Sequence, residues 1–332
     1  MLNRRVFLGA AAVAATLGIF TTSTSAQDRT EVLIDGSSTV GPISEAMAEE
    51  FIAENPDISV VVGISGTGGG FNKFCAGETV ISNASRPIKE SEKELCAANG
   101  IEYVEVPVAY DALTVVVPNS NTWASSLTVE ELKTMWEAAA EGTITNWNQI
   151  RPSFPNQSLV LFGPGTDSGT FDYFGEVIID GDSRADYTAS EDDNVIVLGT
   201  AGTPGALGYF GLAYYEENQD TLQAVAIDNG DGPVLPSAET VNDGTYQPLS
   251  RPIFMYVRKD ALAQPAVASF VDYYLSDEHR NLITEVGYVP LPDEAYALVE
   301  QLVDAGITGS VFSGAPADSS VVALLETAVN SN

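Results

Sequence analysis

Positively charged residues are scarce in this sequence. Its 332 residues include 14 Lys and Arg against 46 Asp and Glu, which gives a formal net charge of −32 at pH 7. A chain this acidic is repelled by nucleic acid and by anionic membrane surfaces, so the composition predicts no nucleic-acid partner. An anionic ligand would have to be held locally, by backbone N–H groups and one or two arginine side chains.

Histidine is scarcer still, because His279 is the only one in the chain. A Ser-His-acid triad therefore has a single candidate base, and a metal centre cannot be built from several histidines. The nucleophile pattern G-x-S-x-G is absent too, since the nearest run, Gly63–Thr67, lacks the last glycine. We expect no enzymatic activity, no cofactor and no metal centre, although a calcium or magnesium site made of carboxylates alone stays open.

Cysteine occurs only twice, at Cys75 and Cys96. In an oxidising compartment we expect the two to form a disulfide, which closes a loop of about 20 residues and contributes roughly 3 kcal/mol to stability. The alternative is a reactive thiol or a metal ligand. A single pair without a histidine cluster nearby favours the disulfide.

Long apolar runs are missing after residue 26, and none approaches the ~20 residues that a membrane-spanning helix needs. Residues 1–26 instead resemble a twin-arginine export signal, with Arg4 and Arg5, a short apolar stretch over 10–20, and small residues before Gln27. A membrane anchor is the alternative, but the apolar stretch is short and Thr and Ser follow it. We expect cleavage near Ala26 and a soluble, periplasmic mature protein.

Apolar runs alternate with segments of helical spacing along the rest of the chain, which indicates an α/β fold with mainly parallel strand pairing. We expect Ala109–Asp111 to cross between two domains, Pro252–Val257 to return to the first, and residues 228–245 to form a loop. The expected strands are 32–34, 58–64, 104–108, 113–117, 159–162, 206–211 and 252–257, and the longer expected helices are 127–140, 265–274, 295–304 and 320–329.

One construction occurs three times: a strand, then glycine with serine or threonine, then the start of a helix. The three segments are Gly36–Val40, Ser65–Gly70 and Thr166–Thr170. Helix N-termini carry unpaired N–H donors and a partial positive charge, and glycine lets the backbone approach a ligand closely. Ordinary capping explains any one of these turns, since Ser and Thr are preferred N-caps. Three such turns together predict a site for a tetrahedral oxyanion, and their spacing fits neither a P-loop nor a dinucleotide motif.

Six motifs together resemble the phosphate-binding subunit of phosphate ABC importers, over essentially the whole mature chain. They are Asp35–Pro42, Gly66–Phe71, Ala84–Ile88, Asp167–Thr170, Gly205–Tyr209 and Pro248–Pro252. The resemblance implies a two-domain periplasmic-binding-protein fold of type II, in the α/β class, with two crossovers and a ligand cleft between the domains. It further implies a discontinuous domain I, made of residues 27–109 and 251–332, and a domain II made of residues 110–250.

The resemblance also implies a set of phosphate-binding residues that come from both domains. They are Ser38, Thr39, Val40, Thr67, Arg86, Asp167, Ser168, Gly169 and Thr170. Well-known members of the family have Asp at the position of Arg86 and an Arg shortly before the Ser-Gly-Thr turn, where this chain has residues 163–165 without a cation.

We therefore expect this chain to use Arg86, within Ser85–Pro87, as its binding cation. A surface ion pair is the alternative role for Arg86. Asp167 would orient Arg86 or accept the proton of monohydrogen phosphate. Asp111 is expected to be a turn residue at the crossover, and Arg251 a structural partner near the hinge.

These observations predict an extracytoplasmic, monomeric solute-binding protein that captures inorganic phosphate and delivers it to the membrane permease of an ABC importer. Because the family's usual aspartate is missing, another oxyanion such as sulfate or molybdate stays open as the ligand. An exported phosphoester hydrolase and an acidic adhesion protein are the alternatives from other classes. Turnover of a phosphoester would favour the hydrolase. The absence of a stoichiometrically bound anion would favour the adhesion protein.

Overall fold

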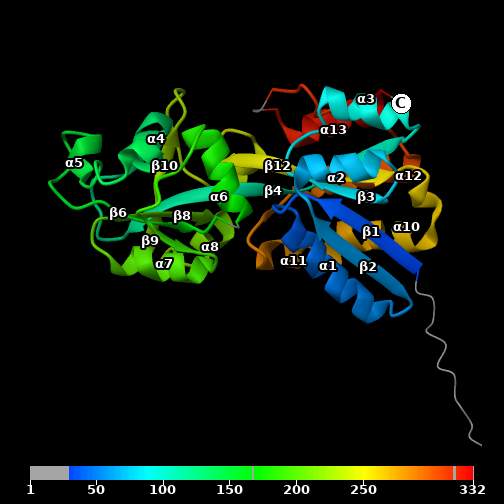
Figure 1. The fold of residues 1–332 in the computed structure, drawn as a ribbon, viewed down its shortest axis with the longest axis horizontal. Helices are drawn as coiled ribbons and strands as arrows, with labels where there is room; N and C mark the ends of the chain where they lie inside the picture. The colour runs from blue at the N-terminus through cyan, green and yellow to red at the C-terminus, as the bar shows by residue number, and fades with distance from the viewer. Residues whose placement is uncertain (1–29, 167, 317–318, 332) are drawn as a thin grey trace, which may run out of the picture.

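The protein consists of two lobes joined by two long strands, as Figure 1 shows. The structure is a computed structural model, and it describes residues 30–166, 168–316 and 319–331. The export signal and its cleavage site lie outside these residues, and so does Asp167. Strands β4 (Tyr103–Pro118) and β12 (Ser250–Arg258) run side by side from one lobe into the other and form the connection between them.

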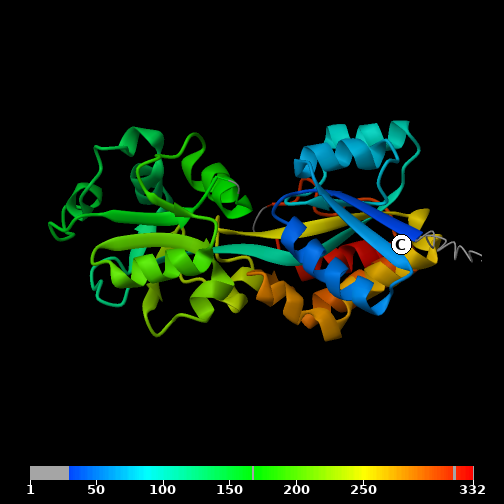
Figure 2. The same ribbon diagram turned by 60° about the horizontal axis from the view of Figure 1, so that its bottom comes forward.

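The first lobe contains the N-terminal and C-terminal parts of the described chain. Its sheet has the order β2-β1-β3-β12-β4, in which β1 pairs in parallel with both β2 and β3. Helices cover both faces of this sheet (Figures 1 and 2). The elements are β1 (Thr30–Gly36), α1 (Gly41–Glu54), β2 (Ile58–Ile64), α2 (Gly66–Cys75), β3 (Ile81–Ala84), α3 (Glu90–Ala98), η3 (Ala261–Ala263), α10 (Pro265–Leu275), η4 (Asp277–His279), α11 (Asn281–Glu285), β13 (Val289–Pro290), α12 (Asp293–Ala305) and α13 (Val321–Asn330).

The second lobe is formed by the middle of the chain. Its sheet continues from β4 in the order β4-β8-β6-β7, and a small separate sheet has the order β11-β10-β5. The elements are β5 (Ser126–Thr128), α4 (Val129–Trp136), η1 (Ala138–Ala140), α5 (Trp147–Ile150), β6 (Val160–Pro164), α6 (Gly169–Phe174), η2 (Gly175–Ile179), β7 (Thr188–Ser190), α7 (Asp193–Gly202), β8 (Ala206–Gly211), α8 (Leu212–Glu216), β9 (Leu222–Ala224), β10 (Ala226–Asp228), β11 (Pro233–Val234) and α9 (Ala238–Asn242).

Strand pairing at the centre of the molecule differs from the expectation of a mainly parallel sheet. β12 pairs antiparallel with both β3 and β4, and β4 pairs antiparallel with β8. The two strands expected over 104–108 and 113–117 form the single strand β4, every residue of which is buried. The prediction that Asp111 is a turn residue is therefore wrong, because Asp111 lies inside β4 opposite Arg251.

Local sequence signals explain where several helices begin. α4 starts with a capping box in which the Glu131 N–H donates to Thr128 Oγ1 and the Thr128 N–H donates to Glu131. The helix predicted over 127–140 is interrupted, since α4 ends at Trp136 and a separate 3₁₀ turn follows. The loop predicted over 228–245 contains β11 and α9.

A buried carboxylate fixes the C-terminal part of the chain to the first lobe. Glu105, in β4, accepts hydrogen bonds from Tyr256 (2.6 Å), Ser310 Oγ (2.5 Å) and the Val311 N–H (3.0 Å). Burial raises the pKa of Glu105, although these donors oppose the rise. The contacts hold the segment after α12 against the sheet, where Phe312 is buried.

The predicted disulfide between Cys75 and Cys96 is present and links the end of α2 to α3. Both cysteines are buried in the core of the first lobe. None of the helices in the described part of the chain combines the length and the apolar character needed to cross a bilayer.

Removing this cross-link is expected to destabilise the first lobe. Replacing both Cys75 and Cys96 by Ala should lower the free energy of unfolding by about 3 kcal/mol, because the open chain gains entropy when it unfolds. Urea denaturation of the variant and of the native protein with and without reductant measures the difference. Equal midpoints for the oxidised native protein and the variant would contradict this role.

Candidate anion site between the lobes

Three parallel strands of the first lobe end side by side and direct their following turns to one edge of the sheet. Gly36 at the end of β1 is paired with Ile64 of β2 and with Asn83 of β3. The Ser37 N–H donates to the Asn83 carbonyl (2.9 Å), and the Ser65 N–H donates to the Gly36 carbonyl (3.2 Å). These bonds hold the turns that precede α1 and α2 against the ends of β3 and β1.

The first turn places the backbone N–H of Val40 at the start of α1. Thr39 is buried, and its N–H donates to Ser37 Oγ (3.1 Å), while Val40 occupies the N-cap position of α1. Among the described residues, no acceptor is bonded to the Val40 N–H. Ser38, between Ser37 and Thr39 in the sequence, is partly buried. The Val40 N–H lies at the positive end of a 14-residue helix, the kind of position at which anions are favoured.

The second turn is pressed closely against the first. A Cβ atom at Gly70 of α2 would lie 2.5 Å from the Gly36 Cα, so this crossing of helix and strand requires glycine. Thr67, in the first turn of α2, has its hydroxyl 3.2 Å from Ser85 Oγ and accepts a hydrogen bond from the Ser85 N–H (3.2 Å). Thr67 therefore lies beside the Ser85–Pro87 turn that carries Arg86.

A charged network lies beneath these turns. Asp35, the buried residue before Gly36, accepts hydrogen bonds from Ser65 Oγ and from Lys73 Nζ (2.5 Å for Lys73). Burial raises the pKa of Asp35, but these two donors outweigh it and leave the pKa below its usual value. The ionised Asp35 thereby anchors the N-cap residue of α2 to β1.

The third turn brings the second lobe into contact with the first. Ser168 caps α6 by accepting from the Thr170 N–H (3.2 Å). A Cβ atom at Gly169 would lie 2.6 Å from Thr39 Oγ1 and 3.0 Å from the Thr39 Cα. Glycine at this position therefore allows the backbone of α6 to touch the first turn across the cleft. Asp167 lies outside the described residues.

Arg86 lies at the cleft but is engaged in an ion pair. Its two Nη atoms donate to the carboxylate oxygens of Glu92 (2.8 and 2.9 Å), and its guanidinium lies 5.8 Å from the centre of the Phe71 ring. Its side chain is 26% exposed, so solvent and small solutes reach it. Arg86 lines an interlobe pocket of about 330 Å³, together with Tyr173 and Arg251.

Arg251 bridges the two lobes at the hinge, as predicted for a structural partner there. Its guanidinium lies 3.4 Å from Asp111 of the neighbouring strand, 3.7 Å from the centre of the Tyr173 ring and 3.3 Å from Glu176. Burial raises the pKa of Asp111, and the positive charge of Arg251 opposes the rise. Because Tyr173 and Glu176 belong to the second lobe, this cluster contributes to the interface between the lobes.

An acidic segment follows β7 in the second lobe. Asp193 begins α7, next to Glu191 and Asp192. Burial and these two neighbouring carboxylates raise the pKa of Asp193 to about 6. Ionisation of Asp193 is therefore less favourable in the folded protein than in the unfolded chain.

Replacing Asp193 by Asn should stabilise the protein at neutral pH. The folded-state pKa of about 6 lies above the reference value of 3.8, so stability falls as pH rises from about 4 to about 6. The amide carries no charge, and we expect the unfolding temperature at pH 7.5 to rise by about 2–4 °C. The gain should vanish at pH 4. The exposed Asp220→Asn variant removes the same charge elsewhere, and an equal gain there would contradict the assignment.

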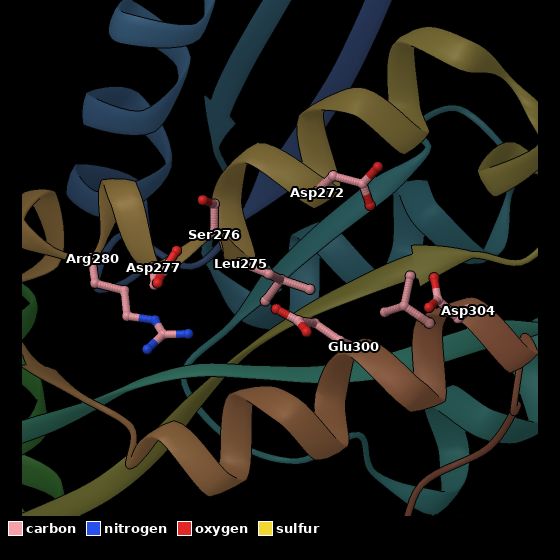
Figure 3. A pocket seen from close by; sticks show the side chains of 8 residues that line it. Asp272, Leu275, Ser276, Asp277, Arg280, Glu300 and Asp304 are labelled. Carbon is pink, nitrogen blue, oxygen red and sulfur yellow. The ribbon is translucent and has the colours of Figure 1, made fainter.

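A second concavity, between α10 and α12, does not suit an anion. Its volume is about 540 Å³, and Figure 3 shows carboxylate side chains around it. The acidic residues are Asp272, Asp277, Glu300 and Asp304, with Arg280 at one end. Within the described ranges, no group of three or more His, Cys, Asp or Glu residues is arranged to hold a metal ion.

The structure thus unites some of the predicted site residues directly and leaves others separate. Thr39 touches Gly169 across the lobes, and Thr67 lies next to the Ser85–Pro87 turn. Among the described residues, no hydrogen bond joins Thr67 to Thr39 or to Ser168. The sequence analysis did not identify Ser85 as a partner of Thr67. The position of Ser85 directly before Arg86 and Pro87 was the signal that could have indicated it.

Two lobes of α/β structure, joined by two shared strands and with glycine-rich turns facing each other, define a periplasmic-binding-protein fold. A family model described as a PBP superfamily domain matches residues 21–278. Protein SphX of Synechocystis sp. is 51% identical over 294 residues, which cover 88% of this chain and 87% of that protein. The chain belongs to the PBP superfamily, within the family that includes SphX and the phosphate-binding protein PstS.

Other relatives agree with this placement. The phosphate-binding protein PstS of Staphylococcus saprophyticus is 38% identical over 82% of this chain and 84% of its own length. A solved structure described as a possible phosphate binding protein from Planctomyces limnophilus is 44% identical, with a TM-score of 0.79, and the match covers 84% of this chain and 99% of that one.

Proposed function

We propose that the protein captures inorganic phosphate between its lobes and delivers it to the membrane permease of an ABC importer. The observation that carries the proposal is the contact of Gly169 with Thr39, which brings two turns from opposite lobes together beside the Val40 N–H, from which no described residue accepts a hydrogen bond. The names of the PstS relatives and of the Planctomyces limnophilus structure support phosphate as the ligand.

In this proposal, phosphate receives hydrogen bonds from both lobes. Ser38, Thr39, Val40 and Thr67 contribute from the first lobe, and Ser168, Gly169 and Thr170 from the second. Arg86 supplies the positive charge after releasing Glu92, and Asp167 orients it or accepts the proton of the ligand. Neutral donors and one guanidinium suffice because the N–H groups lie at helix starts, where anions are favoured.

We further propose that the lobes divide within the shared strands, so that residues 27–109 and 251–332 form one domain and 110–250 the other. The boundaries then fall inside β4 and at the start of β12. Closing of the domains would trap the ligand and present a surface to the permease. The mature protein is proposed to be periplasmic and monomeric, after cleavage near Ala26.

The protein is proposed to bind its ligand without chemical change. The single histidine, His279, is stacked on Tyr273 at 3.5 Å in the first lobe, and none of the contacts described for it involves the glycine-rich turns. A serine in those turns therefore has no histidine to activate it.

Calorimetric titration of the mature chain with phosphate tests this function. We expect one phosphate per protein, with sulfate and molybdate competing weakly between pH 5 and 9. Preferred binding of sulfate or molybdate would assign the protein to another oxyanion. Release of phosphate from a phosphoester would instead identify a hydrolase, and no binding of any oxyanion would overturn the transport function.

A further inference from the structure

Tyr288 makes a hydrogen bond to the anion turn from a distant part of the chain. Its hydroxyl donates to the Thr39 carbonyl at 2.5 Å. Tyr288 lies just before β13, whose pairing with β4 fixes the backbone on one side. On the other side, Gly287 is packed so closely against Tyr214 that a Cβ atom there would lie 2.9 Å from the ring. The hydroxyl is therefore held in place before any ligand arrives.

The bond acts on the peptide unit that carries the Val40 N–H. The Thr39 carbonyl and the Val40 N–H belong to the same planar peptide, and in a trans peptide the two groups point in opposite directions. A carbonyl bonded to Tyr288 on one side therefore leaves the Val40 N–H directed to the other. No described residue accepts from that N–H, and the neighbouring Thr39 borders Gly169 of the second lobe.

We propose that Tyr288 is a positioning residue of the anion site, which fixes and polarises the Thr39–Val40 peptide so that the Val40 N–H is aimed at the ligand. This inference rests on the proposed capture of phosphate. Donation to a peptide carbonyl draws electron density toward the oxygen and makes the N–H of the same peptide a stronger donor. Tyr288 itself does not touch the ligand.

The Tyr288 hydroxyl can donate a hydrogen bond to the Thr39 carbonyl at neutral pH. Burial raises the pKa of Tyr288 well above its usual value, and the nearby carboxylates of Asp111 and Asp193 add to the rise, whereas Arg251 opposes it. The hydroxyl therefore keeps its proton at neutral pH and can donate to the Thr39 carbonyl.

Tyr288→Phe removes the hydroxyl and keeps the ring. We expect phosphate affinity, measured by calorimetry, to fall about tenfold, and the amide ¹⁵N resonance of Val40 in the ligand-free protein to shift. The control is Tyr246→Phe, because the buried Tyr246 hydroxyl also donates to a single backbone carbonyl, that of Leu113 at 2.8 Å, and Leu113 is not in an anion turn. Tyr246→Phe should lower stability without changing the phosphate affinity or the Val40 resonance.

The outcomes separate the inference from the proposed function. If the native protein binds phosphate and Tyr288→Phe binds it equally well, or if both variants lose affinity equally, Tyr288 is not a positioning residue. If the native protein does not bind phosphate, the proposed function fails. In that case the Val40 resonance still decides whether Tyr288 orients this peptide, since an unchanged resonance overturns the inference.

Discussion

Gly169→Ala is expected to weaken phosphate binding by roughly 5- to 150-fold, which corresponds to about 1–3 kcal/mol of steric conflict. The new methyl group would lie 2.6 Å from Thr39 Oγ1, so the two lobes could not approach as they do in the native protein. The free protein avoids the conflict by opening, and its unfolding temperature should change little. Calorimetric titration with phosphate measures the loss.

Gly175→Ala is a closely matched control. Gly175 follows α6 directly, and a Cβ atom there would meet no atom within 4 Å. Neither glycine has a positive φ, so neither substitution strains the backbone. Equal affinities of the two alanine variants would show that the contact between Thr39 and Gly169 has no part in ligand binding.

Arg86→Ala should lower phosphate affinity by at least 30-fold, because the enclosed ligand would lose a charged hydrogen-bond partner, a loss that costs about 2–5 kcal/mol. The native structure presents two roles for Arg86, since the same guanidinium that lines the cleft is paired with Glu92. The variant therefore also loses stability. To separate the two roles, the phosphate affinity of Arg86→Ala has to be compared with that of another variant that loses the same kind of ion pair.

Arg151→Ala provides that comparison. Arg151 also binds one glutamate through two bonds, to Glu131 at 2.8 and 2.6 Å, and also lies over a phenylalanine ring, at 4.6 Å from the centre. It is in the second lobe and does not line the interlobe pocket. We expect similar losses of stability in the two variants and a loss of affinity in Arg86→Ala alone. If both bind phosphate like the native protein, Arg86 is only an ion-pair partner.

Much of the fold could be predicted where the signal is local. The strands at 58–64 and 206–211 have the predicted bounds, because each apolar run ends at residues that favour turns. Pro42 lies at the start of α1, where its fixed φ suits the first helical turn. Capping, apolar periodicity and a lone cysteine pair act within short stretches of chain, so the sequence alone indicates them.

Features that depend on distant partners could not be predicted. The break in apolar character at Asp111 suggested a turn, yet the residue continues a strand because Arg251, 140 residues away, pairs with it. The antiparallel centre of the sheet depends on the same long-range pairing. Likewise, nothing in the sequence around Tyr288 indicates its bond to Thr39, since no local pattern encodes a partner 249 residues away.

The pairing of β4 with β12 limits how the protein can move. Both strands pass through both lobes, so we expect the lobes to move relative to each other only when the two strands bend or twist together. The register shifts between Ile253 and Phe254, a kind of irregularity at which strands bend. If the strands bend at this irregularity, the displacement of each residue should grow with its distance from the bend, so the ends of the molecule farthest from β4 and β12 should move most.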